Sequence, residues 1–395
     1  MNKKAADQRN ILWKYFFYLG FSYGPMVYTM ARTMFVEKLG LLKNSDITDG
    51  IAIGELMPGA VFVDFVSYLG FLLNKARGTF AAVLAFIAPS FLLMLILSFL
   101  YTRYGELPLV QHILRGLSAI MIALIIKVII DIYNSAVKRP VYLAVSVVAL
   151  LLLIIDVNIV SILITGVTTV LLYGIYTGEL TFKKTRITLP DSRSIITFIK
   201  NHLWTVWLTA GLIAVNTTLY FISPDMALMN GNLFKIGLFT FGNGYTMLPF
   251  ISKEVVSTFH WLTPKEFSDG IVMGQITPGP VVIIATFIGY KVGGLLGALT
   301  ATVSIFLPST MLVALVAKPF IRYKDNTWVL QALKGILASF IGLLTLVVAQ
   351  MAKTNITDYK TALFALVSIV LFIYTKINPV ILLVIGIVVS LFMFR

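Results

Sequence analysis

The 395-residue chain contains no cysteine and only three histidines. The absence of cysteine excludes disulfides and thiolate metal sites, and the scatter of His112, His202 and His260 argues against a histidine metal site. A Walker A sequence, an H-E-x-x-H pair and a Ser/His/Asp set are also missing. We therefore expect no enzyme, no metal and no cofactor, so any transport must be secondary or driven by a partner protein.

Charge is scarce as well, because 12% of the residues are charged while 58% are hydrophobic. A soluble domain carries about twice that charged fraction. Apolar runs of 18 or more residues recur along the chain, and each is long enough to cross a bilayer as a helix. The sequence therefore predicts an all-α polytopic membrane protein. Its candidate spans are about 11–33, 48–73, 79–102, 113–133, 141–155, 158–177, 203–222, 232–252, 269–290, 294–317, 329–351, 361–375 and 379–394.

The net charge of +14 does not indicate a nucleic-acid partner, because the basic residues lie in short loops between apolar runs. Loops that follow alternate spans are basic, as at Lys75 and Arg77, whereas the loop at 222–231 has no Lys or Arg. By the positive-inside rule, this alternation predicts a multi-pass protein of the cell membrane with a cytoplasmic N-terminus.

The other loops mostly agree with this topology. The loop with Arg322 and Lys324 is predicted to be cytoplasmic, and the base-poor loop at 103–106 is predicted to lie outside. Lys353 and Lys360 fall on the outside and conflict with the rule.

The sequence also contains an internal repeat. The segments DGIAIGELMPGA (49–60) and DGIVMGQITPGP (269–280) share Asp, Gly, Ile, Gly, Pro and Gly at an offset of 220, and the same offset pairs FSYG (21–24) with FGNG (241–244). With a one-residue gap, Gly70, Gly78, Pro89 and Ser90 pair with Gly289, Gly297, Pro308 and Ser309. Several matches in the same order indicate a duplication.

The repeat predicts how the chain is divided. We expect a first transmembrane repeat at 1–180, a cytoplasmic linker with a connecting transmembrane helix at 181–230, and a second transmembrane repeat at 231–395. Six spans on each side of one connecting span would invert the second repeat relative to the first. Inverted repeats are a common plan in transporters, where the substrate site lies at the repeat interface.

Two kinds of segment interrupt the predicted helices in both repeats. The Gly-rich turns are FSYGP (21–25) and FGNGY (241–245), and the Pro-Gly breaks are MPGA (57–60) and TPGP (277–280). Proline removes an amide donor and glycine tolerates positive φ, so backbone groups become free at membrane depth. A packing kink would explain one such segment, but matched breaks in two repeats favour a transport site.

The ends of broken helices present free N–H groups and a positive dipole, which suit an anion. We therefore predict a substrate site at the two Gly-rich turns and the two breaks. Its predicted residues are Gly24, Pro25, Pro58, Gly59, Gly242, Asn243, Gly244, Gln275, Pro278, Gly279 and Pro280.

Ionisable residues inside membrane spans are costly and often functional. Glu55 lies three residues before Pro58 and Asp64 six residues after it, whereas the second repeat has Gln275 and Ile284 at these positions. The two halves therefore differ in charge around their breaks, and the first half carries the acids.

A further charged pair, Lys127 and Asp131, lies four residues apart in the span at 113–133. This spacing allows a structural ion pair on one helix face, which is the alternative to a role in coupling. The predicted coupling residues are Glu55, Asp64, Lys127 and Asp131.

At these motifs the chain resembles the chromate ion transporter family. The resemblance is strongest in the second half, and the first half matches more loosely through FSYGP, FVEKLGLL (35–42) and ELMPGA (55–60). The segments that carry it in the second half are LFKIGLFTFGNGYTMLPFISKEVV (233–256), WLTPKEFSDGIVMGQITPGP (261–280) and FIGYKVGGLLGALTATVSIFLPS (287–309).

The resemblance implies movement of chromate, an oxyanion shaped like sulfate, out of the cytoplasm. It assigns Pro278, Gly279 and Pro280 to the family's break, Gly242 and Gly244 to its turn, and Asp64 to its acidic residue. The chain departs from the family pattern in the first half. Tyr28 replaces a histidine, Tyr23 a turn glycine, Ala60 a proline, and Val61 and Phe62 polar residues.

The sequence thus predicts a secondary transporter of an inorganic oxyanion that exports chromate, with proton coupling left open. A transporter of an organic or lipid-like anion is one alternative, favoured by Val61 and Phe62, and a non-coupled channel-like component is another. We expect an asymmetric site in which the second half contacts the anion and the first supplies proton-linked carboxylates. The expected partners are a small inorganic anion and membrane lipids, and a homodimer remains open.

Overall fold

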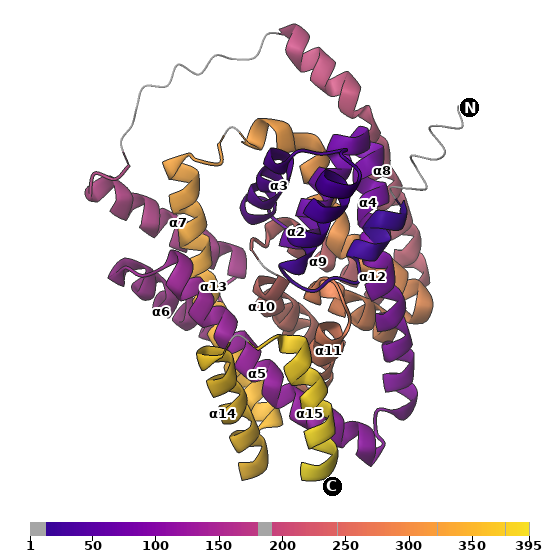
Figure 1. Ribbon diagram of the computed structural model, residues 1–395, viewed down its shortest axis with the longest axis vertical. Helices are drawn as coiled ribbons and strands as arrows, with labels where there is room; N and C mark the ends of the chain where they lie inside the picture. Colours follow the sequence, from indigo (N-terminus) through magenta and orange to yellow (C-terminus); the bar gives the residue numbers. More distant parts are fainter. Residues whose placement is uncertain (1–12, 181–191, 243, 322, 376, 395) are drawn as a thin grey trace.

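The computed structural model describes residues 13–180, 192–242, 244–321, 323–375 and 377–394, and these ranges are helical without a strand. The predicted all-α class is therefore confirmed (Figure 1). The first half contains a helix at 13–19, α2 (Met26–Ala31), the π-helix η1 (Arg32–Lys38), α3 (Asn44–Leu56), α4 (Val61–Tyr104), α5 (Pro108–Ala136), α6 (Pro140–Ile154) and α7 (Ile159–Tyr176).

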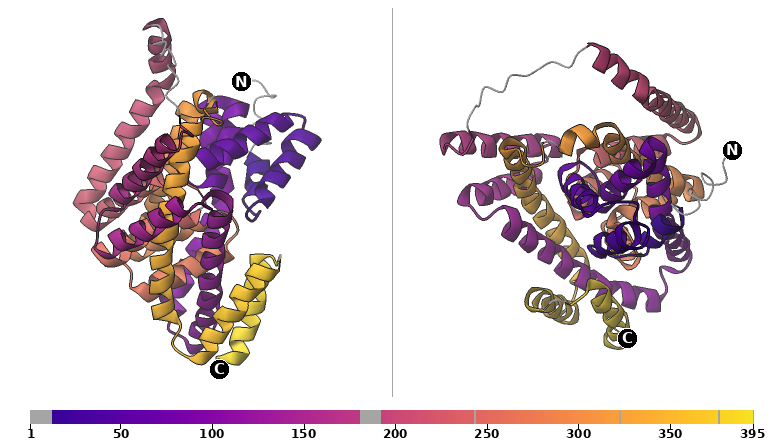
Figure 2. Two further views of the ribbon diagram at one scale, coloured as in Figure 1. Left: turned by 90° about the vertical axis from the view of Figure 1, so that its left-hand side faces the viewer. Right: turned by 45° about the horizontal axis from the view of Figure 1, so that its top comes forward.

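One long helix, α8 (Ser192–Ile222), leads into the second half, and it lies along the outside of the bundle (Figure 2). The second half contains α9 (Pro224–Phe239), η2 (Gly244–Met247), α10 (Leu248–Ser252), the π-helix η3 (Lys253–Thr258), α11 (Pro264–Ile276), η4 (Val281–Ile283), α12 (Ile284–Ile321), α13 (Thr327–Asn355), α14 (Tyr359–Tyr374) and α15 (Pro379–Met393).

The two halves repeat the same order of helices. α3 and α11 begin and end at an offset of 220, and α5 and α13 begin and end at an offset of 219. The predicted duplication therefore extends to helix boundaries. Asn158 and Asn378, also 220 apart, each cap a helix by accepting a hydrogen bond from a backbone N–H two residues later.

Each Pro-Gly break is the tip of a helical hairpin. α3 folds back on the start of α4, so that a Cβ placed on Gly54 would lie 2.6 Å from the carbonyl oxygen of Val61. In the second half, a Cβ on Gly274 would lie 3.0 Å from the carbonyl oxygen of Val281. α3 and α11 have 13 residues each and are about 20 Å long, which is too short for a 30 Å bilayer core. The regions predicted as single spans at 48–73 and 269–290 are therefore hairpins.

A second reversal follows each hairpin, inside α4 and inside α12. Asn74 and Lys75 leave the helical conformation, and Lys75 has a φ of 48°. A Cβ on Gly70 would lie 2.4 Å from the carbonyl oxygen of Gly78, although residues eight apart in a straight helix are about 12 Å apart. The chain therefore turns back here and continues as a long arm, 76–104.

The same reversal occurs in α12 at Gly293 and Gly294, where Gly294 has a φ of 57°. Gly289 and Gly297 come together as their counterparts do, with 2.2 Å between the Cβ position on Gly289 and the Gly297 carbonyl oxygen. The long arm of the second half is therefore 295–321.

The two halves interlock by exchanging their outer helices. Helices α6 and α7 of the first half pack on α13 of the second half. In return, α14 and α15 of the second half pack on α5 of the first, and α4 packs on α12 (Figures 1 and 2). Within the described residues, five helices are long and apolar enough to cross a membrane. They are α4, α5, α7, α12 and α13.

Polar contacts fasten one exchanged helix pair at its end. Arg115 of α5 forms a 3.0 Å ion pair with Asp358, which caps α14. A hydrogen bond from the backbone N–H of Thr361 holds the pKa of Asp358 below its usual range, and Arg115 adds to this effect. The α14–α15 pair of the second half is thereby attached to the first half.

We predict that Gly289→Ala destabilises the protein by about 1–3 kcal/mol, because the new methyl group overlaps the backbone of Gly297. Gly231→Ala, in α9, is the matched control, since a Cβ there meets nothing within 4 Å. It should be neutral or stabilising by up to about 1 kcal/mol. Thermal unfolding in detergent measures both effects, and equal stabilities of the two variants would contradict the close reversal.

Candidate functional site

The first break meets the Gly-rich turn of the second half. Pro58 and Phe241 form an isolated antiparallel bridge, and the N–H of Gly59 donates to the carbonyl oxygen of Thr240 at 2.6 Å. Gly59 has a φ of 138°, which favours glycine. The backbone that the first break frees is therefore paired with the other half of the protein.

The second break is held by the first half in the same way. The hydroxyl of Ser90, in the long arm of α4, donates to the carbonyl oxygen of Pro278. A Cβ on Gly279, where φ is 97°, would lie 2.2 Å from that hydroxyl and 3.7 Å from the carbonyl oxygen of Gly20. The second break thus lies against the long arm and the Gly-rich turn of the first half.

Ser90 has a counterpart in Ser309, at the repeat offset. Ser309 lies in the long arm of α12, and its Cβ would be 2.3 Å from a Cβ on Gly59. The serines of the two repeated Pro-Ser pairs therefore support the breaks. Ser90 of the first half supports the second break, and Ser309 of the second half supports the first break. Sequence analysis found these serines as repeat positions but assigned them no role.

Asp64 lies beside the first break, in the first turn of α4, and its side chain is fully buried. Its Oδ2 would be 2.5 Å from a Cβ on Gly59. Neither carboxylate oxygen has a partner with hydrogen-bond geometry, although the Ser309 hydroxyl lies next to them. A buried carboxylate without a partner is expensive when it is charged, so this environment accommodates the protonated form.

A chain of polar side chains crosses the interface near the second break. The hydroxyls of Tyr23 and Tyr245 lie close to each other, and Tyr245 donates to Oε1 of Gln275 at 2.6 Å. Gln275 is fully buried, and its Nε2 has no hydrogen-bond partner. The arrangement leaves an amide donor free at the last turn of α11, next to the second break.

The centre between the two halves is therefore polar although it is buried. Sequence analysis placed Gln275 and Asp64 here, but it missed Tyr245, whose role depends on a contact across the fold. The polar side chains at the breaks and turns that are at most 2% exposed are Asp64, Ser67, Ser90, Thr240, Thr246, Gln275, Thr277 and Ser309.

The Gly-rich turns flank this centre, although a Cβ on Gly24 of the first turn would meet nothing within 4 Å. Gly24 has a φ of 54° and is followed by Pro25, the exposed residue that precedes α2. Gly242 has a φ of 92°, and a Cβ on Gly244 would lie 2.8 Å from Val282 of η4. Both predicted turns therefore exist as turns.

Pro280 and Asn243 complete the predicted site residues of the second half. Pro280 is the residue before η4, so the N-terminal end of η4 follows directly on the second break. Asn243 lies outside the described residues.

The predicted coupling residues do not all lie together. The side chain of Glu55 is exposed, and its carboxylate places negative charge near Tyr28. Lys127 and Asp131 form an ion pair with each other on α5, with 30% and 58% of their side chains exposed. Asp64 is the predicted coupling residue that the fold buries against a break.

Comparison with known proteins agrees with this arrangement in two halves. The family model described as chromate transporter matches residues 11–173 and 227–391. The chain belongs to the chromate transporter family. Proteins of this family are transporters, so the protein is a membrane anion transporter and not an enzyme.

Relatives from three other organisms match the sequence of this chromate transporter family member over most of its length. The chain is 30% identical over 361 residues to the chromate transport protein of Cupriavidus metallidurans, covering 91% of this chain and 85% of the relative. It is 29% identical over 365 residues to an uncharacterized transporter of Methanocaldococcus jannaschii, covering 92% and 89%. A probable chromate transport protein of Synechococcus elongatus is 29% identical over 355 residues, covering 89% and 86%. No solved structure matches the chain.

We predict that Gly279→Ala lowers anion flux about tenfold or more in this transporter, because the new Cβ overlaps the Ser90 hydroxyl. Adding Ser90→Ala removes that hydroxyl and should restore part of the flux. Gly59→Ala should be equally harmful, but Ser309→Ala should not rescue it, since the overlap there involves the Cβ of Ser309.

The control for these variants is Gly178→Ala. Gly178 also has a positive φ, of 74°, but a Cβ there meets nothing within 4 Å. It should keep its flux in vesicle assays. A rescue pattern that is the same at both breaks would contradict the contacts described here.

Proposed function

We propose that this protein is a secondary transporter that exports chromate, or an oxyanion of the same shape and charge, in exchange for protons. The observation that carries the proposal is the reciprocal pairing of each Pro-Gly break with the opposite half, around a buried polar centre. Broken helices at matched positions of two repeats are the usual place of a transporter's substrate site.

The anion is bound at the second break in this proposal. Gln275 offers an amide donor that has no protein partner, and Tyr245 fixes the amide by bonding its oxygen. η4 runs directly into α12, so the free N–H groups at the start of this helix add a positive end that favours a negative ligand. A dianionic oxyanion needs several donors of this kind because the surrounding core is apolar.

The proton is carried by Asp64 at the first break. A charged carboxylate without a partner is costly in the buried centre, so we expect the anion-free protein to return across the membrane only with Asp64 protonated. The proton taken up outside would be released to the cytoplasm before the next anion binds, which couples anion export to proton entry. This gives the asymmetric site its two parts, with the acid in the first half and the amide donor in the second.

The two halves are inverted relative to each other in this proposal. Phe80, at the start of the long arm of α4, contacts Trp204 near the beginning of α8, with 5.4 Å between the ring centroids. Its counterpart Leu299, at the start of the long arm of α12, lines a cavity together with Ile213 and Asn216 farther along α8. The starts of the matched arms thus lie toward different parts of α8, which supports opposite directions.

The alternatives are less well supported. Phe62 packs against Tyr28, with 5.4 Å between the ring centroids, so the apolar residue after the first break has a structural role without an organic ligand. A channel-like component would need a continuous polar path, whereas the first break is closed by backbone pairing and the second by the Ser90 hydroxyl. Neither observation favours a second function.

Uptake of chromate into everted membrane vesicles tests the proposal. We expect saturable uptake that sulfate-like anions inhibit and that a protonophore abolishes. Vesicles that contain the protein but take up no oxyanion above the empty-vector control would refute the proposed substrate class.

We predict that Asp64→Asn abolishes proton-driven accumulation of chromate while downhill exchange continues, because asparagine mimics the protonated acid. Counterflow of labelled chromate measures the exchange. The control is Asp131→Asn, which removes the exposed partner of Lys127 and should keep proton-driven accumulation. If Asp131→Asn loses accumulation and Asp64→Asn keeps it, the coupling role belongs to the α5 pair.

A further inference from the structure

The repeated motif contains an aspartate that the substrate site does not use. Asp49 is the sixth residue of α3, and Asp269 is the sixth residue of α11. Each lies nine residues before the proline of its break, or about 14 Å along the helix. The two carboxylates therefore mark the mouths of the two hairpins, far from the breaks at their tips.

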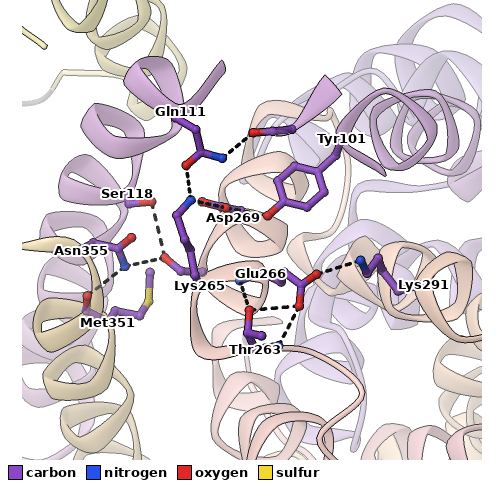
Figure 3. A network of polar contacts seen from close by, with 12 residues as sticks. Tyr101, Gln111, Ser118, Thr263, Lys265, Glu266, Asp269, Lys291, Met351 and Asn355 are labelled. Carbon is purple, nitrogen blue, oxygen red and sulfur yellow. Dashed lines mark hydrogen bonds and ion pairs between the residues drawn. The ribbon is translucent and has the colours of Figure 1, made fainter. Parts of the chain in front are cut away.

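Asp269 connects α11 to the first half of the protein. It accepts a hydrogen bond of 2.8 Å from the hydroxyl of Tyr101, in the last turn of α4, and one of 3.2 Å from Nζ of Lys265 (Figure 3). Lys265 also donates to Gln111, in the first turn of α5. The side chain of Asp269 is 1% exposed. We call this cluster the α11 latch.

Asp49 connects α3 to the second half in the matching place. Nζ of Lys324, three residues after the end of α12, lies 3.0 Å from Oδ1 of Asp49. Their side chains are 26% and 35% exposed. We call this pair the α3 latch.

The two latches are equivalent under the repeat but differ in chemistry. In each, the motif aspartate of one half holds the end of the long arm of the other half. The α11 latch has a buried carboxylate with two donors, whereas the α3 latch is one partly exposed ion pair. An exposed pair is weaker and is screened by salt, so the α3 latch should open more readily.

We propose that the α3 latch and the α11 latch are the two gates of the transport cycle. This inference rests on the inverted arrangement of the proposed function. The basic loop with Lys324 is predicted to be cytoplasmic and the loop at 103–106 to lie outside, so the α3 latch closes the cytoplasmic mouth and the α11 latch the outer mouth. Because the α3 latch is weaker, the protein without substrate opens more often to the cytoplasm, where an exported anion must enter.

The absence of cysteine allows this to be tested with single reporter cysteines in the full-length chain. Ile53 and Met273 are equivalent residues one helical turn below the two aspartates, and they are 0% and 4% exposed. Ile53→Cys reports on the cytoplasmic mouth and Met273→Cys on the outer mouth. A membrane-impermeant maleimide is applied to right-side-out or everted vesicles, and the rate of labelling is measured.

Breaking one latch should open one mouth and close the other. We expect Lys324→Met to raise labelling of Ile53→Cys from the cytoplasmic side about fivefold, and to lower labelling of Met273→Cys. Tyr101→Phe removes only the hydroxyl and should do the reverse, from the outer side. High salt should raise labelling of Ile53→Cys more than that of Met273→Cys.

The matched control is Lys291→Met, which breaks a 2.8 Å ion pair with Glu266 inside the second half (Figure 3). It should leave both labelling rates unchanged. If Lys324→Met does not fold, the exchanged pair Asp49→Lys with Lys324→Asp replaces it, and slow labelling in that variant supports the latch.

Equal effects of Lys324→Met and Lys291→Met, or labelling of both reporters from one side, would overturn the gate proposal. These readouts do not require oxyanion flux. Reciprocal labelling without chromate transport would therefore refute the proposed substrate and keep the gates, and transport without reciprocal labelling would refute the gates alone.

Discussion

Backbone pairing between the two halves is the constraint on which the rest of this structure depends. A helix broken at membrane depth leaves N–H and C=O groups that lipid cannot satisfy. Here the N–H of Gly59 is bound by the carbonyl of Thr240, and the carbonyl of Pro278 is bound by Ser90. Neither half completes its own break, so each break must pack against the opposite half. That requirement explains the glycines at the tips, because side chains there would collide with the supporting serines.

Both halves contain the same broken helices, but the buried acid and the buried amide each occur in only one of them. Asp64 faces the supports of the first break, whereas its counterpart is Ile284. Gln275 is buried beside the second break, whereas its counterpart Glu55 is exposed. A symmetric scaffold with an asymmetric centre suits a transporter, because the scaffold can alternate between two similar states while one acid and one amide serve both.

Much of the fold follows from the sequence, because apolar runs, loop charges and a repeat are local signals. The reversals at Asn74 and at Gly293 fall at the boundaries between predicted spans, where Lys75 gives a loop charge and Gly293 and Gly294 a helix interruption. The hairpins at the two breaks did not follow from these signals, since a hydropathy window reads a hairpin of two short helices as one span. The site was predictable at the breaks, where proline and glycine occur in both copies. The contact of Tyr245 with Gln275 was not, because it depends on how the turn folds over α11.

The proposed transport mechanism requires an oxyanion to bind at the second break, against the free amide of Gln275. Selenate has the shape of sulfate and scatters anomalously, so diffraction from crystals grown with selenate locates the anion directly. We expect one anomalous peak beside Gly279, within hydrogen-bond distance of the Gln275 amide. A peak elsewhere in the membrane-spanning region, with none at the second break at a concentration that saturates transport, would contradict the proposed site.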